Sequence, residues 1–160
     1  MSDNFPCCKY LNLPAIPDHV IKDELDYFPD AKDIAKSASI KYGHTDNPVY
    51  AKTDITSTSL KEWLNHNISN QMHYAFQIIP GKDGALPLHK DVKTNQKLSY
   101  ILDTAGENVL TNFYDDEKNL LQSIKIEPKR WHIIDVTKFH EVIGIDEDEV
   151  RLSITGKIFF

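Results

Sequence analysis

The stretch HYAFQIIPGKDGALPLHKDVKTNQKLSYILD, residues 73–103, alternates short apolar runs with turn-forming residues. The apolar runs are rich in Ile, Leu, Tyr and Phe, and they cover 73–81, 85–91 and 97–103. Gly and Asp residues lie at the breaks, as in the segment PGKDG. Short runs of β-favouring residues between turn residues predict a succession of β-strands rather than helices.

The same pattern continues to the end of the sequence. Five further runs of this kind cover 108–116, 120–127, 130–136, 139–144 and 150–160. Eight short strands at this spacing are typical of a jelly roll. We therefore expect a mainly β fold with N-terminal helices, in which residues 72–160 form a double-stranded β-helix, the cupin-like jelly roll.

The first 70 residues predict a mixed, partly helical support for that core. Apolar residues at helical spacing indicate helices over 18–28 and 59–67, and a third helix over 31–42. Ser59 opens the sequence Ser-Leu-Lys-Glu, which fits a capping box. Residues 48–58 are rich in Thr and Ser and are predicted to be loop with a short strand.

Composition narrows the classes of function. The net charge is −6 and the lysines are scattered, which disfavours a nucleic-acid partner because such proteins usually carry a basic patch. No apolar run approaches the roughly 20 residues of a membrane helix, and no signal peptide is visible, so we expect a cytoplasmic protein.

The adjacent Cys7 and Cys8 form no metal motif and are expected to be free thiols near a mobile terminus. The length favours one domain over 1–160 and leaves the oligomeric state open.

Three potential metal ligands fall on one side of the predicted barrel. His89 and Asp91 lie two residues apart at the end of the second predicted strand, so both side chains can point inward. His140 lies in the seventh strand, which can neighbour the second strand in a jelly roll. Two imidazoles and one carboxylate on one face, with the opposite positions open, are the facial triad of non-haem Fe(II) oxygenases.

The His-x-Asp spacing alone is not evidence for a metal site. The chain holds seven His and 16 Asp residues, so such a pair is expected by chance, and two are present. The other pair, His44 and Asp46, lies in a predicted loop and is interpreted as surface. The alternative interpretation of His89 and Asp91 is likewise a surface pair at a strand end, and His132 is the best rival ligand.

The two arginines stand out against 16 lysines. Arg151 opens the last predicted strand, and Ser153 follows it at the same parity. A guanidinium can grip a carboxylate through two parallel hydrogen bonds, which Lys cannot do. Arg151 and Ser153 therefore form a candidate carboxylate receptor inside the barrel. Lys97 and Asn112 are further candidate pocket groups, on strand parity alone.

The same parity turns apolar side chains of the last strand to the outside of the barrel. Leu152, Ile154 and Ile158 would face outward there. Apolar side chains in that position need cover. The predicted helices over 18–28 and 59–67 are the available candidates.

Together, His89-x-Asp91, His140 and Arg151-x-Ser153 resemble the 2-oxoglutarate/Fe(II)-dependent oxygenases. The stretch IIPGKDGALPLHKD is similar to the lead-in of prolyl-hydroxylase-like members, and TNQKLSYILD resembles a strand of aspartyl/asparaginyl-hydroxylase-like members. The resemblance implies that His89, Asp91 and His140 are catalytic and bind Fe(II). It also implies that Arg151 and Ser153 hold the distal carboxylate of the co-substrate 2-oxoglutarate.

Two positions depart from the family pattern. Ile79 stands where many prolyl-hydroxylase-like members have a Tyr that touches the co-substrate, and Lys157 stands where nucleic-acid demethylases carry a second Arg. The expected activity is hydroxylation of a peptide side chain or a small metabolite. The alternatives are a cupin-type metalloenzyme that uses no 2-oxoglutarate and a jelly-roll binding module without enzymatic activity.

Overall fold

The computed structural model describes residues 6–27, 51–81, 85–91 and 94–158. The predicted helix over 31–42 and the His44–Asp46 pair lie outside these residues. Within the described ranges, no helix is long and apolar enough to cross a membrane.

Two antiparallel sheets make up most of the regular structure. The larger sheet has the strand order β1-β8-β5-β10-β3-β2, formed by β1 (Cys8–Tyr10), β2 (Ala51–Asp54), β3 (Tyr74–Pro80), β5 (Gln96–Asp103), β8 (Trp131–Asp135) and β10 (Val150–Ile158). The smaller sheet has the order β4-β9-β6-β7, formed by β4 (Ala85–His89), β6 (Leu110–Tyr114), β7 (Leu120–Ile124) and β9 (Phe139–Ile143). The eight strands predicted from residue 73 onward therefore form, as β3 to β10.

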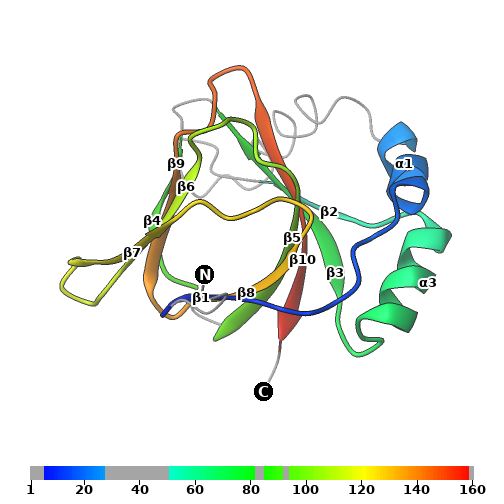
Figure 1. The fold of residues 1–160 in the computed structure, drawn as a ribbon, viewed down its shortest axis with the longest axis horizontal. Helices are drawn as coiled ribbons and strands as arrows, with labels where there is room; N and C mark the ends of the chain where they lie inside the picture. The colour runs from blue at the N-terminus through cyan, green and yellow to red at the C-terminus, as the bar shows by residue number, and fades with distance from the viewer. Residues whose placement is uncertain (1–5, 28–50, 82–84, 92–93, 159–160) are drawn as a thin grey trace.

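From β3 onward the chain passes repeatedly between the two sheets. Strands β3, β5, β8 and β10 belong to the larger sheet, and β4, β6, β7 and β9 belong to the smaller one. Figure 1 shows the sheets facing each other, with the smaller sheet on the left. Strands remote in sequence become neighbours in this arrangement, so that β4 pairs with β9 and β5 pairs with β10. The predicted contact between the second and seventh strands of the core is confirmed.

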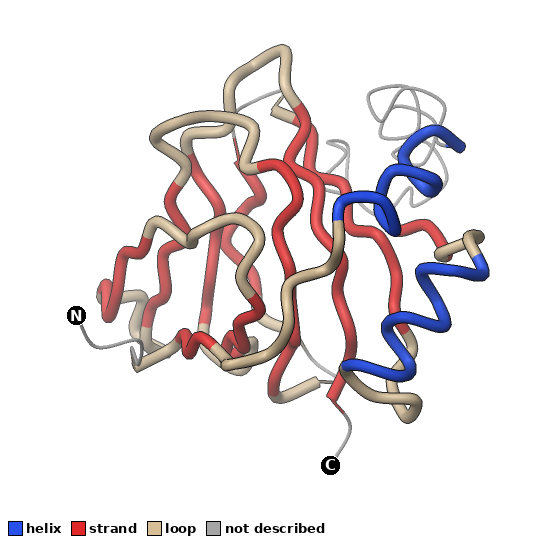
Figure 2. Tube along the Cα trace, turned by 45° about the vertical axis from the view of Figure 1, so that its right-hand side comes forward, coloured by secondary structure: helices blue, strands red, loops and turns tan. Residues whose placement is uncertain are grey.

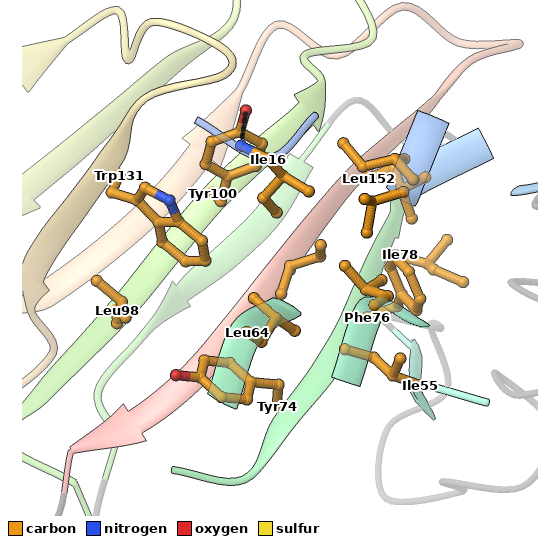
Figure 3. Packing of buried hydrophobic residues seen from close by; sticks show 14 of the residues in the cluster. Ile16, Ile55, Leu64, Tyr74, Phe76, Ile78, Leu98, Tyr100, Trp131 and Leu152 are labelled. Atoms are coloured by element: carbon orange, nitrogen blue, oxygen red, sulfur yellow. Dashed lines mark hydrogen bonds between the residues drawn. The ribbon is translucent and has the colours of Figure 1, made fainter. Parts of the chain in front are cut away.

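Helices α1 (Asp18–Tyr27) and α3 (Thr58–Asn67) lie against the outer face of the larger sheet, as Figure 2 shows. Leu152 and Ile154 of β10 belong to one buried cluster with Leu60 and Leu64 of α3. Figure 3 shows Leu64 and Leu152 within this cluster, beside the aromatic residues of β3. Burial of one such side chain stabilises the fold by roughly 1.5–3 kcal/mol. The predicted cover of the last strand by helices is confirmed for these two side chains.

Helix α3 is capped by a different serine from the one predicted. The hydroxyl of Ser57 accepts a hydrogen bond from the backbone N–H of Leu60 at 3.2 Å, and Ser57 has the extended backbone of an N-cap residue. A hydroxyl N-cap binds the N–H three residues ahead, and Ser57 stands at that distance. The prediction of Ser59 as the cap is wrong; its hydroxyl lies 2.9 Å from that of Ser57.

The two cysteines are buried, contrary to the expectation of thiols near a mobile terminus. Cys7 and Cys8 are free thiols with 4% and 2% of their surface exposed. Cys8 begins β1 and lies opposite Ile134 of β8 at the edge of the larger sheet. Burial raises the pKa of Cys8 to about 12, so this thiol stays protonated and unreactive at neutral pH.

Apolar side chains fill two regions between the sheets. One cluster contains Ile101 of β5 and Phe113 of β6, and the other contains Ile79 of β3 and Val142 of β9. One pocket is lined by members of both clusters, Ile126 of the first and Ile79 and Val142 of the second. Apart from Ile134, the remaining lining is polar, and it holds most of the residues predicted to form the site.

Candidate metal centre and the adjoining pocket

Strand pairing brings the two predicted histidine ligands together. His89 at the end of β4 is the register partner of His140 on β9, after an irregularity that follows Leu86. Their ring centroids lie 4.2 Å apart. Asp91 follows β4, and its Oδ1 lies 3.6 Å from Nε2 of His89. One ligand atom from each of the three residues lies within 4.8 Å of the other two, so the trio could hold a metal ion.

The environment of His140 suits a metal ligand. Its Nδ1 lies 2.9 Å from the backbone carbonyl oxygen of Lys138. A carbonyl only accepts, so Nδ1 carries the proton and Nε2 keeps a lone pair for a ligand. Burial lowers the pKa of His140, which favours the neutral imidazole that a metal requires.

The trio is open to solvent on one side. The side chains of His89 and Asp91 are each 32% exposed, whereas His140 is buried. Two nitrogens and one carboxylate are a donor set that suits a divalent iron ion. A metal held by these three groups would therefore keep positions accessible for further ligands.

The predicted carboxylate receptor lies in the pocket that begins at the two histidines. His89, His140, Arg151 and Ser153 all line this pocket. Arg151 and Ser153 of β10 are buried, with 7% and 4% of their surface exposed. The structure therefore brings the receptor and the two histidines into one cavity.

Arg151 is a buried cation. Among the residues that the structure describes, no carboxylate forms an ion pair with it. Burial lowers the pKa of Arg151 to about 10, so the guanidinium stays charged at neutral pH. Buried charges in proteins are normally paired, and an unpaired guanidinium inside a pocket is a feature that an anionic ligand would satisfy.

Lys97 also lines the pocket, as predicted from strand parity. Its ammonium group donates a hydrogen bond to Oε1 of Gln77 at 2.8 Å. Burial, and next the nearby charge of Lys52, lower the pKa of Lys97 to about 7. Gln77 is buried in the same lining and was not among the predicted site residues, although its parity with Ile79 could have indicated it.

Asn112, a predicted pocket residue, does not line the pocket. Its Nδ2 donates to Oε1 of Glu141 at 3.2 Å, a side chain that Tyr114 also contacts. The neighbouring Thr111 lines the pocket instead. Because adjacent residues of a strand point to opposite faces, Asn112 faces the other side of the smaller sheet.

The rival ligand His132 lines the pocket but does not join the metal-ligand trio. It is 1% exposed, and its Nδ1 lies 3.1 Å from the backbone carbonyl oxygen of Arg130. Burial lowers its pKa to about 4. His132 is therefore a neutral, buried pocket residue at physiological pH.

Comparison with solved structures shows that the fold is shared with prolyl hydroxylases. A prolyl hydroxylase from Trichoplax adhaerens, in complex with a hypoxia inducible factor oxygen degradation domain peptide fragment, is 13% identical with a TM-score of 0.61, over 95% of this chain and 83% of that chain. A prolyl-4-hydroxylase from Pseudomonas putida is 10% identical with a TM-score of 0.53, over 96% of this chain and 92% of that chain. At these identities the similarity establishes the fold alone.

Other similar structures are longer than this chain. An oxidoreductase of the 2OG-Fe(II) oxygenase family from Burkholderia pseudomallei is 11% identical with a TM-score of 0.43, and the match covers 64% of this chain and 52% of that chain. The chain thus spans about half the length of that protein. At the level of sequence, no family model matches the chain, and no curated protein is significantly similar to it.

Proposed function

We propose that this chain is an Fe(II)- and 2-oxoglutarate-dependent oxygenase whose strands β3 to β10 form a double-stranded β-helix. Its substrate would be a peptide side chain or a small metabolite, which it would hydroxylate. The observation that carries this proposal is that candidate metal ligands and a buried cation lie in the same pocket. Two histidines of a trio able to hold a metal share one pocket with a buried guanidinium, which no carboxylate among the described residues pairs with.

His89, Asp91 and His140 would hold the iron and are the proposed catalytic residues. His140 would bind through Nε2, because its Nδ1 proton is directed at a backbone carbonyl. Asp91 would supply the one negative charge among the protein ligands. When bound, Fe(II) would supply the activation of O2, coupled to oxidative decarboxylation of 2-oxoglutarate to succinate and CO2. The protein would position both partners and limit the access of water.

Arg151 and Ser153 would orient the co-substrate. The guanidinium of Arg151 can form two parallel hydrogen bonds with the distal carboxylate, and the hydroxyl of Ser153 would supply another donor. The opposite end of the co-substrate would then lie toward the histidines at the other side of the pocket lining. Ile79 lines this pocket, so the position that holds Tyr in many family members is apolar here.

Shared fold and site chemistry support the proposal independently. The Trichoplax and Pseudomonas structures are prolyl hydroxylases by name, and the first of them holds a peptide, which supports a peptide as one class of substrate. A cupin-type metalloenzyme without a keto-acid co-substrate would have no use for a buried guanidinium that no carboxylate among the described residues pairs with. A binding module would have no use for the metal-ligand trio.

The test is release of succinate from 2-oxoglutarate in the presence of Fe(II) and O2, with a panel of amino acids and peptides as substrates. We expect turnover in the wild type and none in His140→Ala. His73→Ala serves as the control, because His73 is an exposed histidine that lies 3.4 Å from Asp54 and does not belong to the metal-ligand trio. Succinate release that survives His140→Ala would refute the assignment.

A further inference from the structure

A hydrogen bond on the inner face of the larger sheet crosses β10 beside the proposed carboxylate receptor. β10 lies between β5 and β3 in the sheet. The ammonium of Lys97 on β5 reaches over β10 to Oε1 of Gln77 on β3. Gln77 is the register partner of Ser153 on β10. Lys97, Gln77 and Ser153 line the same pocket, so the ammonium lies on the face of the sheet that holds the place proposed for the distal carboxylate.

This ammonium has a neutral partner and positively charged surroundings. Within the described part of the chain, no carboxylate forms an ion pair with Lys97. Burial lowers the pKa of Lys97 most, the nearby charges of Lys52, Lys157 and Arg151 lower it further, and the charge of Asp91 raises it. An uncompensated ammonium in such a place loses its proton readily. A carboxylate that arrived beside Ser153 would reverse this balance.

We propose that Lys97, positioned by Gln77, is a second cationic anchor for the distal carboxylate, and that it takes up a proton from solvent when the dianion binds. The inference rests on the proposed use of 2-oxoglutarate. The proton goes to Nζ and no other covalent bond changes. Arg151 would supply the fixed charge and Lys97 the charge that appears on binding, so affinity for the co-substrate would fall as pH rises above neutrality.

Charged and titratable groups from several elements interact electrostatically with Lys97. They are Lys52 of β2, Asp91 after β4, His132 of β8, His140 of β9, and Arg151 and Lys157 of β10. The two histidines have lowered pKa values and stay neutral above pH 7. Arg151 stays charged in that range. The histidines and Arg151 therefore do not account for a change of protonation near neutral pH. A variant that lacks Lys97, rather than the pH profile alone, tests whether Lys97 is the group that titrates.

The test is anaerobic calorimetry of 2-oxoglutarate with the Fe(II)-loaded protein in two buffers of different ionisation enthalpy. The difference in heat between the buffers counts protons taken up. At pH 8 we expect the wild type to take up close to one proton per molecule bound. Lys97→Met should bind about tenfold more weakly or worse, because a charged hydrogen bond is lost, and its proton uptake should disappear. Lys61→Met, on the exposed face of α3, is the control for loss of one positive charge and should match the wild type.

A second variant keeps the inference testable if Lys97→Met does not fold. Gln77→Glu keeps the shape of the side chain and places a carboxylate against Lys97. The ammonium would then be charged before the ligand arrives, so proton uptake should vanish and affinity should fall. Unchanged affinity and proton uptake in both variants would overturn the role of Lys97 and leave the proposed function intact. A wild type that does not bind 2-oxoglutarate would overturn both.

Discussion

His89 and His140 are 51 positions apart in the sequence, yet they are register partners on β4 and β9 with ring centroids 4.2 Å apart. The pairing of two strands from distant parts of the chain therefore creates the candidate metal centre. Asp91 joins them from the residues that follow β4. A shift of one residue in this register would turn one imidazole to the other face of the sheet.

Removal of the carboxylate should abolish tight metal binding. Asp91→Ala takes away the only anionic member of the trio, and we expect Fe(II) titration under anaerobic conditions to show at least a tenfold loss of affinity, in line with the effect of removing even supporting groups at metal sites. Asp54→Ala is the matched control, because Asp54 also lies near a histidine, His73, but on an exposed surface. Equal affinities in the two variants would mean that His89-x-Asp91 is only a surface pair.

Conservation of charge at Arg151 should not preserve co-substrate binding. Arg151→Lys keeps a cation in the pocket but loses the planar fork that forms two parallel hydrogen bonds. A hydrogen bond to a charged group contributes roughly 1.5–3 kcal/mol, so we expect affinity for 2-oxoglutarate to fall by about ten- to a hundredfold. Calorimetry on the metal-loaded variant measures this. Affinity within twofold of the wild type would show that Arg151 acts only through its charge or not at all.

Strand alternation made much of the site predictable from sequence. His89 and Arg151 were assigned to the interior because parity along a strand is a local property, and both line the pocket. The parity argument failed for Asn112. Residues 111–113 are all buried in β6, so no alternation of buried and exposed residues marks the face that lines the pocket. The contact between Lys97 and Gln77 depends on the register of three strands, which no local pattern contains.

The structure also differs from the prediction where several residues of the sequence give the same signal, or where the sequence gives none. Residues 56–59 read Thr-Ser-Thr-Ser, and any of these hydroxyls could cap a helix, so the choice of Ser57 needs the actual backbone. Strand β1 spans three residues and is held by pairing with β8. Its sequence carries no strand pattern of its own, which is why Cys7 and Cys8 were expected at a mobile terminus rather than in a buried edge.

His132 should make the protein sensitive to acid. Burial lowers its pKa from the ordinary 6.5 to about 4 in the folded state, so between these values the unfolded chain binds a proton that the folded chain does not. The contribution of His132 to the free energy of unfolding is therefore fully present above pH 6.5. It is lost as pH falls toward 4, by about 3 kcal/mol in total. Urea unfolding at a series of pH values, compared between wild type and His132→Gln, isolates the contribution. A stability difference that stays constant from pH 7 to 4 would contradict it.

The two serines before α3 should differ in their effect on stability. Ser57→Ala removes the acceptor for the Leu60 N–H and should reduce the free energy of unfolding by about 0.5–2 kcal/mol. Ser59→Ala, within the first turn, should cost less, since its hydroxyl contacts only the Ser57 hydroxyl among the hydrogen bonds described. Chemical denaturation of the two variants decides this. A larger loss in Ser59→Ala would restore the capping box predicted from the sequence.

The most direct test of the account is whether binding of 2-oxoglutarate depends on the metal. Calorimetry should compare Fe(II)-loaded and metal-stripped protein, each titrated anaerobically with 2-oxoglutarate and with glutarate, which lacks the keto oxygen. We predict that 2-oxoglutarate binds the loaded protein much more tightly than the stripped protein, whereas glutarate, held mainly at Arg151, distinguishes the two far less. Absence of 2-oxoglutarate binding to the loaded protein, or binding that Fe(II) does not change, would contradict the account.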